Sequence, residues 1–256
     1  MSIHPTAIVS PKAKLGDNVE VGPYCIIGDN VKIGDNCRLI HHVNIEGYSK
    51  IGAHNLFHPF CTIGTKTQDL KYKGEPTWLI MGDHNEFREF TSVNRGTSPE
   101  EKTIIGNHNL FLTYSHVAHN CEVGNHCILS NNGTLGGHVI VEDYVIISGL
   151  AAVHQFCRVG QHSMIGGCSK IVQDVPPYFI ADGNPADVRA VNTVGLQRRG
   201  FTEEQIALLR RARRTLYDAN LNTSQALTLL EEELGANPEV QVLINFVRNS
   251  QRGIIR

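Results

Sequence analysis

The chain lacks the features of several large protein classes. No apolar run approaches the roughly 20 residues that a membrane span needs, and the first segment, MSIHPTAIVSPKAK, has no basic start followed by an apolar stretch, so no signal peptide is expected. The 23 basic and 25 acidic residues nearly balance, which argues against a nucleic-acid-binding surface built from bulk charge. Seven cysteines without a CxxC pair indicate a reducing compartment rather than a disulfide framework. We therefore expect a cytoplasmic protein with no membrane insertion and no nucleic-acid partner.

A six-residue repeat dominates the sequence instead. An apolar residue recurs at every sixth position over residues 3–63, and the same phase returns over residues 81–93 and 105–171. This period fits neither a 3.6-residue helix nor an unbroken alternating strand. It fits a short strand followed by a corner, so that three units make an 18-residue coil and stacked coils make a triangular parallel β-helix. Glycine or asparagine is expected at the corners, where a positive φ is often needed.

The phase of the repeat also predicts which cysteines point inward. Cys168 alone lies off the pattern. The other six lie two residues before an apolar position, in a slot otherwise filled by small side chains, and are expected to pack in the core as small hydrophobes: Cys25, Cys37, Cys61, Cys121, Cys127 and Cys157.

The histidines of the segment YSHVAHNCEVGNHC, residues 114–127, fall in other phases. His116 precedes an apolar position and His119 follows one by two residues, so both are expected to point outward. Coils stack about 4.8 Å apart, and residues 18 apart therefore share a column. This arrangement places Gly137 beside His119 and brings His138 and His154 into the same outward patch, a cluster that suggests function.

The repeat is interrupted near residues 65–79 and 95–103 by polar, turn-rich segments that are expected to leave the solenoid as loops. Loops on a rigid scaffold often line sites, so Asp69 and Lys71 are candidate substrate contacts, with solvated loop charges as an equal alternative. Pro176 and Pro177 cannot donate to a β-ladder and are expected to mark the exit from the sheet. Residues 1–186 should thus form the β-helix and residues 187–256 a C-terminal helical domain.

Three helices are expected in this last segment. The first follows a Thr202–Gln205 capping box and runs to about Ala219. The second begins at Ser224 and runs to about Leu234, and the third begins at Pro238 and runs to about Asn249. The RRARR stretch, residues 210–214, is read as a solvated helix face rather than as a dock for an acidic partner.

The repeat resembles that of the hexapeptide-repeat acyltransferases, whose β-helix is left-handed. Four segments make the resemblance more specific: TQDLKYKGEPT, SHVAHNCEVGNHCILSNNGTLGGHV, AVHQFCRVGQHSMIGGCSKIVQDVPPY, and GLQRRGF with the closing RGIIR. Together they resemble the UDP-N-acetylglucosamine O-acyltransferases, which begin lipid A synthesis, over essentially the whole chain. The resemblance implies transfer of an (R)-3-hydroxyacyl group from acyl carrier protein to the 3-hydroxyl of UDP-N-acetylglucosamine. It also implies a homotrimer with sites between subunits, no cofactor and no metal.

The resemblance assigns roles residue by residue. His119 is implied as the general base, because a neutral imidazole can take the hydroxyl proton at cellular pH, and the N–H of Gly137 as the donor to the oxyanion. The other implied positions are sugar contacts (Asp69, Lys71), residues around the sugar and thioester (His116, His138), nucleotide-side contacts (His154, Gln155, Asn192), a phosphate contact (Arg199), a residue facing the carrier protein (Arg198) and a position that governs acyl length (Gly167).

Three positions depart from the family pattern. The residue after the base is commonly Asp and here is Asn120, which accepts a hydrogen bond but adds no charge; in a serine-protease triad that exchange costs about 10⁴ in rate. Asn94 stands where a His is often found. Pro185 stands where some members have a His at the acyl end, so the preferred acyl length stays open.

Three other interpretations remain. A γ-class carbonic anhydrase is also a trimeric β-helix, and His116 with His119 could supply two of its zinc ligands, which stoichiometric zinc would reveal. A non-catalytic hexapeptide scaffold would keep any transferase activity unchanged on His119→Ala. The N-acyltransferase of the same pathway usually carries an added N-terminal domain, whereas here the repeat begins at Ile3.

Overall fold

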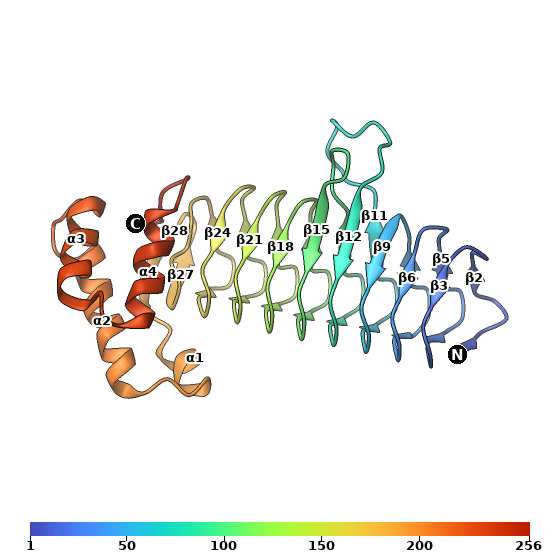
Figure 1. Cartoon of the computed structure of the whole chain (residues 1–256), viewed down its shortest axis with the longest axis horizontal. Coiled ribbons are helices and arrows are strands. Elements are labelled where there is room, and N and C mark those ends of the chain that lie inside the picture. The colour runs from blue at the N-terminus through green and yellow to red at the C-terminus, as the bar shows by residue number, and fades with distance from the viewer.

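The computed structural model describes residues 1–256, and most of the chain forms a long prism of parallel strands that ends in a group of helices (Figure 1). Most strands contain only two residues, because the chain turns a corner in every six-residue unit. The strands form three sheets, which we call A, B and C.

The bounds of the strands follow the repeat. Sheet A contains β1 (Ser2–Ile3), β4 (Glu20–Val21), β7 (Arg38–Leu39), β10 (Leu56–Phe57), β13 (Glu86–Phe87), β16 (Leu110–Phe111), β19 (Ile128–Leu129), β22 (Ile146–Ile147), β25 (Met164–Ile165), β27 (Phe179–Gly183) and β28 (Ala186–Val191). Sheet B contains β2 (Ile8–Val9), β5 (Ile26–Ile27), β8 (Asn44–Ile45), β11 (Thr62–Thr65), β14 (Ser92–Asn94), β17 (His116–Val117), β20 (Thr134–Leu135), β23 (Ala152–Val153) and β26 (Lys170–Ile171). Sheet C contains β3 (Lys14–Leu15), β6 (Lys32–Ile33), β9 (Tyr48–Ile51), β12 (Trp78–Met81), β15 (Lys102–Ile105), β18 (Glu122–Val123), β21 (Ile140–Val141) and β24 (Arg158–Val159).

The strand register confirms the predicted 18-residue coil and locates the two insertions. Leu110 pairs with Ile128, 18 residues later, whereas Leu56 pairs with Glu86, 30 residues later. The extra residues leave the prism between β11 and β12, and a shorter excursion lies between β14 and β15. Both project from the same side of the prism, where Figure 1 shows them as adjacent loops.

Apolar side chains of the repeat fill the interior. Every apolar repeat position from Val21 to Ile171 is buried, and the six predicted core cysteines are buried while Cys168 is exposed. The rings of Phe57 and Phe87 stack 5.3 Å apart, and those of Phe87 and Phe111 4.6 Å apart. The prediction of an inward-facing set from sequence phase is therefore confirmed.

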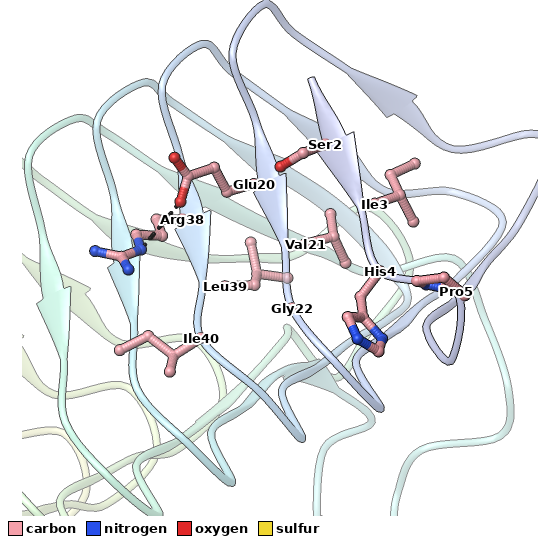
Figure 2. Close-up of a pocket in the computed structure, with 10 residues that line it drawn as sticks. All are labelled: Ser2, Ile3, His4, Pro5, Glu20, Val21, Gly22, Arg38, Leu39 and Ile40. Carbon is pink, nitrogen blue, oxygen red and sulfur yellow. Dashed lines mark ion pairs between the residues drawn. The ribbon is translucent and has the colours of Figure 1, made fainter.

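The first coil is the exception to this burial. Ile3 remains 42% exposed, because no coil covers it on its outer side. Figure 2 shows a shallow pocket over β1, β4 and β7, bordered by Ile3, Val21 and Leu39 and by the Glu20–Arg38 ion pair, whose atoms are 3.1 Å apart. The pocket contains none of the predicted site residues.

The corners differ from the expectation that glycine or asparagine would supply positive φ. The left-handed corner residues are mostly His, Phe and Tyr, such as Phe60 with φ 65° and His126 with φ 56°. The rings of successive coils stack on one another, as Phe60 does on Phe90 and His108 on His126, and this stacking offsets the cost of positive φ. The repeated glycines serve another purpose: a Cβ on Gly34 would lie 2.7 Å from the carbonyl carbon of Gly52 in the next coil.

The prolines do not end the sheet, contrary to expectation. After Pro176 and Pro177 the chain adds β27, which pairs in parallel with β25, and then β28, which returns antiparallel to β27. Strand β28 therefore crosses the predicted domain boundary at residue 186. A hairpin can close the last coil because its antiparallel strand needs no further parallel partner.

Four helices follow: α1 (Thr193–Arg198), α2 (Glu203–Tyr217), α3 (Thr223–Leu234) and α4 (Pro238–Arg248). The Thr202–Gln205 capping box is confirmed, but the second predicted helix is capped by Asn222 and begins one residue before Ser224. Helix α1 was not predicted. The closing residues return to the prism, where the main chain of Gly253 and Ile255 bonds to that of Asp174. None of the helices is both long and apolar enough to cross a membrane.

Candidate active site

The predicted site residues lie on the edges of the prism. The prism has three edges, each named by the two sheets that meet there. Residues with positive φ form a column along each edge. The B–C edge includes Asn120, His138 and Phe156; the C–A edge includes His126, Tyr144 and His162; and the A–B edge includes Tyr114, Leu150 and Cys168.

His119 and Gly137 are adjacent at the B–C edge, as the 18-residue column predicts. The imidazole of His119 is 13% exposed, and a Cβ built on Gly137 would lie 2.6 Å from its Cε1 and Nε2 atoms. Only glycine leaves room for the ring in this position. The N–H groups of Gly136 and His138 donate to neighbouring coils, but that of Gly137 donates to no group of the chain.

Asn120 fixes the tautomer of His119. The N–H of Thr97 donates to Oδ1 of Asn120 at 3.2 Å, and because an amide N–H can only donate, this contact identifies the oxygen end of the side chain. The same oxygen lies 2.9 Å from Nδ1 of His119. Nδ1 must therefore carry the hydrogen, which leaves the lone pair of Nε2 available to accept a proton.

The two neighbouring histidines are held neutral. Burial lowers the pKa of His116, whose Nδ1 lies 2.7 Å from Oγ of Ser92. Burial also lowers the pKa of His138, whose ring is perpendicular to that of His119, with centroids 5.2 Å apart, and stacks on Phe156.

The first insertion brings a carboxylate to the same edge. Oδ2 of Asp69 lies 3.9 Å from Nε2 of His119, and the backbone N–H of Lys71 donates to Oδ1 of Asp69 at 2.9 Å. Lys71 itself is exposed. Asn94 anchors the start of this loop by donating to Oγ1 of Thr65 at 2.9 Å and to the carbonyl of Lys66 at 3.2 Å. Asn94 is buried, and these two bonds hold the start of the loop against the prism.

His154 and Gln155 lie one coil further along this region and are exposed. Nδ1 of His154 donates to the carbonyl of Gln155 at 3.1 Å. A Cβ on Gly136 would lie 2.8 Å from the backbone nitrogen of Gln155. The glycine pair at 136 and 137 thus allows close packing both of His119 and of the following coil.

The remaining predicted residues lie on other edges. The guanidinium of Arg199 stacks over the ring of Tyr144 at the C–A edge, 4.7 Å from its centroid, and Arg198 is exposed at the end of α1. Asn192 is buried, and its side chain caps α1 and donates to the carbonyl of His162 at 2.9 Å. Its predicted nucleotide contact stays a prediction.

Gly167 is next to the A–B edge. A Cβ there would meet only the carbonyl of Gly149 at 3.5 Å, an ordinary contact, so the surface beside it is open. A single chain therefore brings together His119, Gly137, His138 and Asp69, but leaves Arg199 and Gly167 on separate edges.

Sequence reasoning missed two residues of the B–C edge, Thr97 and Glu101. Both come from the second insertion and contact Asn120. No repeat phase applies within the insertion, so only the polar composition of the segment could have suggested them.

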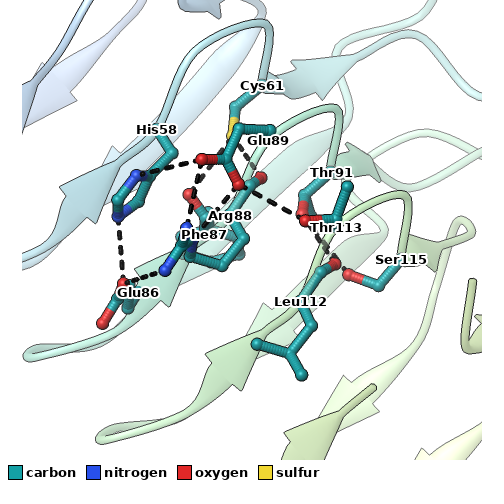
Figure 3. Close-up of polar contacts among 10 residues, drawn as sticks. All are labelled: His58, Cys61, Glu86, Phe87, Arg88, Glu89, Thr91, Leu112, Thr113 and Ser115. Atoms are coloured by element: carbon teal, nitrogen blue, oxygen red, sulfur yellow. Dashed lines mark hydrogen bonds and ion pairs between the residues drawn. The ribbon is translucent and has the colours of Figure 1, made fainter. Parts of the chain in front are cut away.

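A second polar cluster lies on strands β10 and β13 and the turns that follow them (Figure 3). Nε2 of His58 lies 2.9 Å from Oε1 of Glu86, and Nδ1 of His58 lies 3.6 Å from Oε1 of Glu89. The hydrogen bond from the guanidinium of Arg88 lowers the pKa of Glu89 to about 2. Cys61 points inward and donates to the carbonyl of Arg88 at 3.0 Å, while burial raises its pKa to about 12. These side chains are paired with one another, and the thiol stays protonated at neutral pH. No group of three or more His, Cys, Asp or Glu residues in the chain is arranged to hold a metal ion.

Comparisons with known proteins agree with this architecture. A family described as UDP-N-acetylglucosamine O-acyltransferase, domain 2, matches residues 174–255, and the bacterial transferase hexapeptide family matches residues 12–47 and 102–137. An acyl-(acyl-carrier-protein)–UDP-N-acetylglucosamine O-acyltransferase of Pseudomonas syringae pv. syringae is 49% identical over 255 residues, which cover 99% of both chains. The corresponding protein of Ectopseudomonas mendocina is 48% identical over 256 residues, covering 100% of this chain and 99% of that one.

Solved structures extend the similarity to the fold. The UDP-N-acetylglucosamine acyltransferase of Bacteroides fragilis is 45% identical and superposes with a TM-score of 0.97 over 100% of both chains. The UDP-N-acetylglucosamine O-acyltransferase of Moraxella catarrhalis is 43% identical, with a TM-score of 0.95 and the same coverage. A left-handed parallel β-helix, a helical C-terminal part and full-length identity above 40% lead to one conclusion: the chain is an acyltransferase and belongs to the acyl-(acyl-carrier-protein)–UDP-N-acetylglucosamine O-acyltransferase family.

Proposed function

We propose that this enzyme transfers an (R)-3-hydroxyacyl group from acyl carrier protein to the 3-hydroxyl of UDP-N-acetylglucosamine, the first step of lipid A synthesis, with His119 as general base. One observation carries the proposal: Nδ1 of His119 is held by Asn120 as a donor, so that the basic Nε2 lies against the main chain of Gly137. The names of the full-length relatives supply the substrate pair.

The chemistry follows from these two groups. Nε2 takes the proton of the sugar hydroxyl as its oxygen bonds to the thioester carbon, which develops a negative charge on the thioester oxygen. The N–H of Gly137, which the chain leaves unpaired, is the donor for that oxyanion. As the C–S bond breaks, the imidazolium returns the proton to the leaving thiolate. No covalent enzyme intermediate is needed.

Substrate contacts extend from this centre. The carboxylate of Asp69, 3.9 Å from Nε2, would accept hydrogen bonds from sugar hydroxyls and favour the imidazolium once it forms. Lys71, His116 and His138 complete the sugar and thioester side. His154 and Gln155 would contact the nucleotide.

A homotrimer is part of the proposal, because the predicted contacts are divided among separate edges of one chain. Arg199 at the C–A edge suits a phosphate, since a guanidinium offers two parallel donors. It can join His119 only if a second copy supplies it. The A–B edge exposes a column of apolar side chains that a neighbouring copy would cover, and Gly167 beside it would border the acyl chain: Phe60, Phe90, Tyr114 and Leu150.

The proposal also includes a contact with acyl carrier protein and a location in the cytoplasm. Arg198, exposed at the end of α1, would face acyl carrier protein. A cytoplasmic location suits seven unpaired cysteines.

The test is an assay of purified protein with a series of acyl-carrier-protein thioesters and UDP-N-acetylglucosamine, beside its 3-amino analogue. We expect an ester product and a loss of activity of about 10²–10⁴-fold in His119→Gln, the range for a general base. Activity on the amino sugar alone would replace the proposal by N-acyl transfer. Unchanged transferase activity in His119→Gln would remove His119 from the mechanism.

A further inference from the structure

Asn120 makes a contact that the base alone does not explain. Its Nδ2 donates to Oε2 of Glu101 at 2.9 Å, while its Oδ1 accepts from Nδ1 of His119 at 2.9 Å. The amide therefore lies between an imidazole and a carboxylate. Its oxygen faces the imidazole, and its NH2 group faces the carboxylate, which can only accept. The N–H of Thr97 on Oδ1 excludes the flipped amide, which would place a donor against a donor.

Glu101 is held firmly in this arrangement. The backbone N–H of Ser98 donates to the same Oε2 at 2.8 Å, and the carbonyl of Glu101 accepts from the N–H of Trp78 at 2.9 Å. The bond from Ser98 lowers the pKa of Glu101 below its ordinary value, with a further contribution from Asn120. Glu101 is therefore a carboxylate at neutral pH.

We propose that Glu101 is a positioning residue of the transfer reaction: its carboxylate, acting through the amide of Asn120, orients His119 and stabilises the imidazolium. The inference rests on the proposed role of His119 as general base. No proton passes along the chain of groups, because the Asn120 amide keeps its hydrogens throughout. The carboxylate polarises the amide, and the amide oxygen in turn attracts the Nδ1 hydrogen more strongly as positive charge develops on the ring.

The same geometry shows why Asp would not suit residue 120. An Asp there would place its carboxylate against that of Glu101, 2.9 Å away, and two carboxylates at that distance do not both ionise. Asn carries the effect of the more distant charge without that conflict. Asn120 and Glu101 thus form a matched pair, in which one carboxylate acts on His119 through the amide.

Other charged and titratable groups also lie around His119: Asp69, His116 and His138, with Lys71 acting on His138. The variant Glu101→Gln leaves all of them in place. A single oxygen of Glu101 accepts both the Ser98 and the Asn120 bonds, so the Gln carbonyl can replace it and only the charge is lost. Glu122→Gln is the matched control, because Glu122 is an exposed glutamate on the neighbouring strand β18.

The experiment compares pH profiles of kcat and kcat/KM for the wild type, Glu101→Gln, Asn120→Asp and the double variant. For Glu101→Gln we expect a fall in kcat of about tenfold with little change in KM. We also expect the acid limb of the profile, the fall in activity on the low-pH side, to move to lower pH, because loss of a negative charge lowers the pKa of the base. Glu122→Gln should match the wild type. In the double variant, the amide introduced at position 101 must turn so that its N–H donates to the carboxylate introduced at position 120, with loss of the bond from Ser98. That carboxylate then lies beside His119 without an opposing carboxylate and should restore much of the lost rate, so the two substitutions are non-additive.

A structural role for Glu101 alone predicts something different. Loss of activity through loop disorder would leave the acid limb in place and would not be rescued by Asn120→Asp. Wild-type activity with an unmoved limb in Glu101→Gln, while His119→Gln is inactive, would overturn the inference and leave the general base intact. Should Glu101→Gln fail to fold, nitrogen-15 spectra of histidine-labelled wild type, with His119 assigned against His119→Gln, decide the matter: a hydrogen on Nε2 rather than Nδ1 contradicts the proposal.

Discussion

Gly137→Ala tests the closeness of His119 to the neighbouring coil. The added methyl carbon would lie 2.6 Å from Nε2 and Cε1 of the imidazole, whereas carbon contacts are optimal at about 3.5 Å or more. The ring must therefore move by about 0.9 Å or more, by rotation about its side-chain bonds. A misplacement of about 1 Å can cost about 10²-fold in rate, and we expect a fall of that size in kcat/KM.

The cost to folding should be smaller than the cost to activity. The ring is the end of a side chain and is 13% exposed, so it can move outward without disturbing the core. We expect a loss of about 1–2 kcal/mol in the free energy of unfolding, within the range for overpacked sites. Alanine keeps its backbone N–H, so the variant moves the imidazole of His119, the proposed base, while it keeps the N–H of residue 137, the proposed oxyanion donor.

The assay is steady-state transfer with acyl carrier protein and UDP-N-acetylglucosamine, beside guanidinium unfolding of the same preparation. Gly28→Ala is the control, since a Cβ there meets its nearest neighbour, the Cα of Glu46, at 3.4 Å. Wild-type kcat/KM in a folded Gly137→Ala protein would refute the contact between His119 and Gly137 as a requirement of catalysis.

Other residues give shorter tests. Phe87→Ala should lose about 3–5 kcal/mol of stability in chemical unfolding, because its ring is fully buried between two others; a loss below about 1 kcal/mol would contradict the stacked core. Leu150→Glu, at a side chain 63% exposed on the A–B edge, should reduce the mass seen by light scattering to that of one chain if copies meet there, and an unchanged mass would place the interface elsewhere. Burial lowers the pKa of His162 and other histidines below 6.5, so as pH falls through about 6.5 the unfolded chain takes up more protons and stability should decline. His162→Phe should reduce that decline in unfolding midpoints measured at about pH 7.5 and about pH 5.5, either side of the ordinary histidine pKa, and an unaltered slope would exclude His162 as a source.

The fold was largely predictable because one periodic rule determines it. The phase that places Val117 inward also places Cys121 inward, and stacking makes His119 and Gly137 neighbours without further information. The corner chemistry was not predictable in the same way. A positive φ at Phe60 or His126 is unfavourable for an isolated residue and becomes tolerable only when the ring above and the ring below are in place.

The same distinction between repeat and non-repeat segments applies to the candidate site. Residues within the repeat were found, whereas Glu101 and Thr97 were missed, because the insertion that carries them obeys no period and its path depends on tertiary contacts. The hairpin after Pro177 was missed for a related reason. Proline forbids a donor only at its own position, and the strand that follows can rejoin the sheet.

The two ends of the prism differ. The first coil is exposed on its outer side, whereas the β27–β28 hairpin covers the last coil. Because each coil contacts only its neighbours, we expect the exposed coil that contains Ile3 to open more readily than the last coil, which the main-chain hydrogen bonds of Gly253 and Ile255 to Asp174 hold in place. The coils that carry His119 and Gly137 lie well inside both ends of the prism, so local opening of the coil that contains Ile3 should leave the proposed site undisturbed.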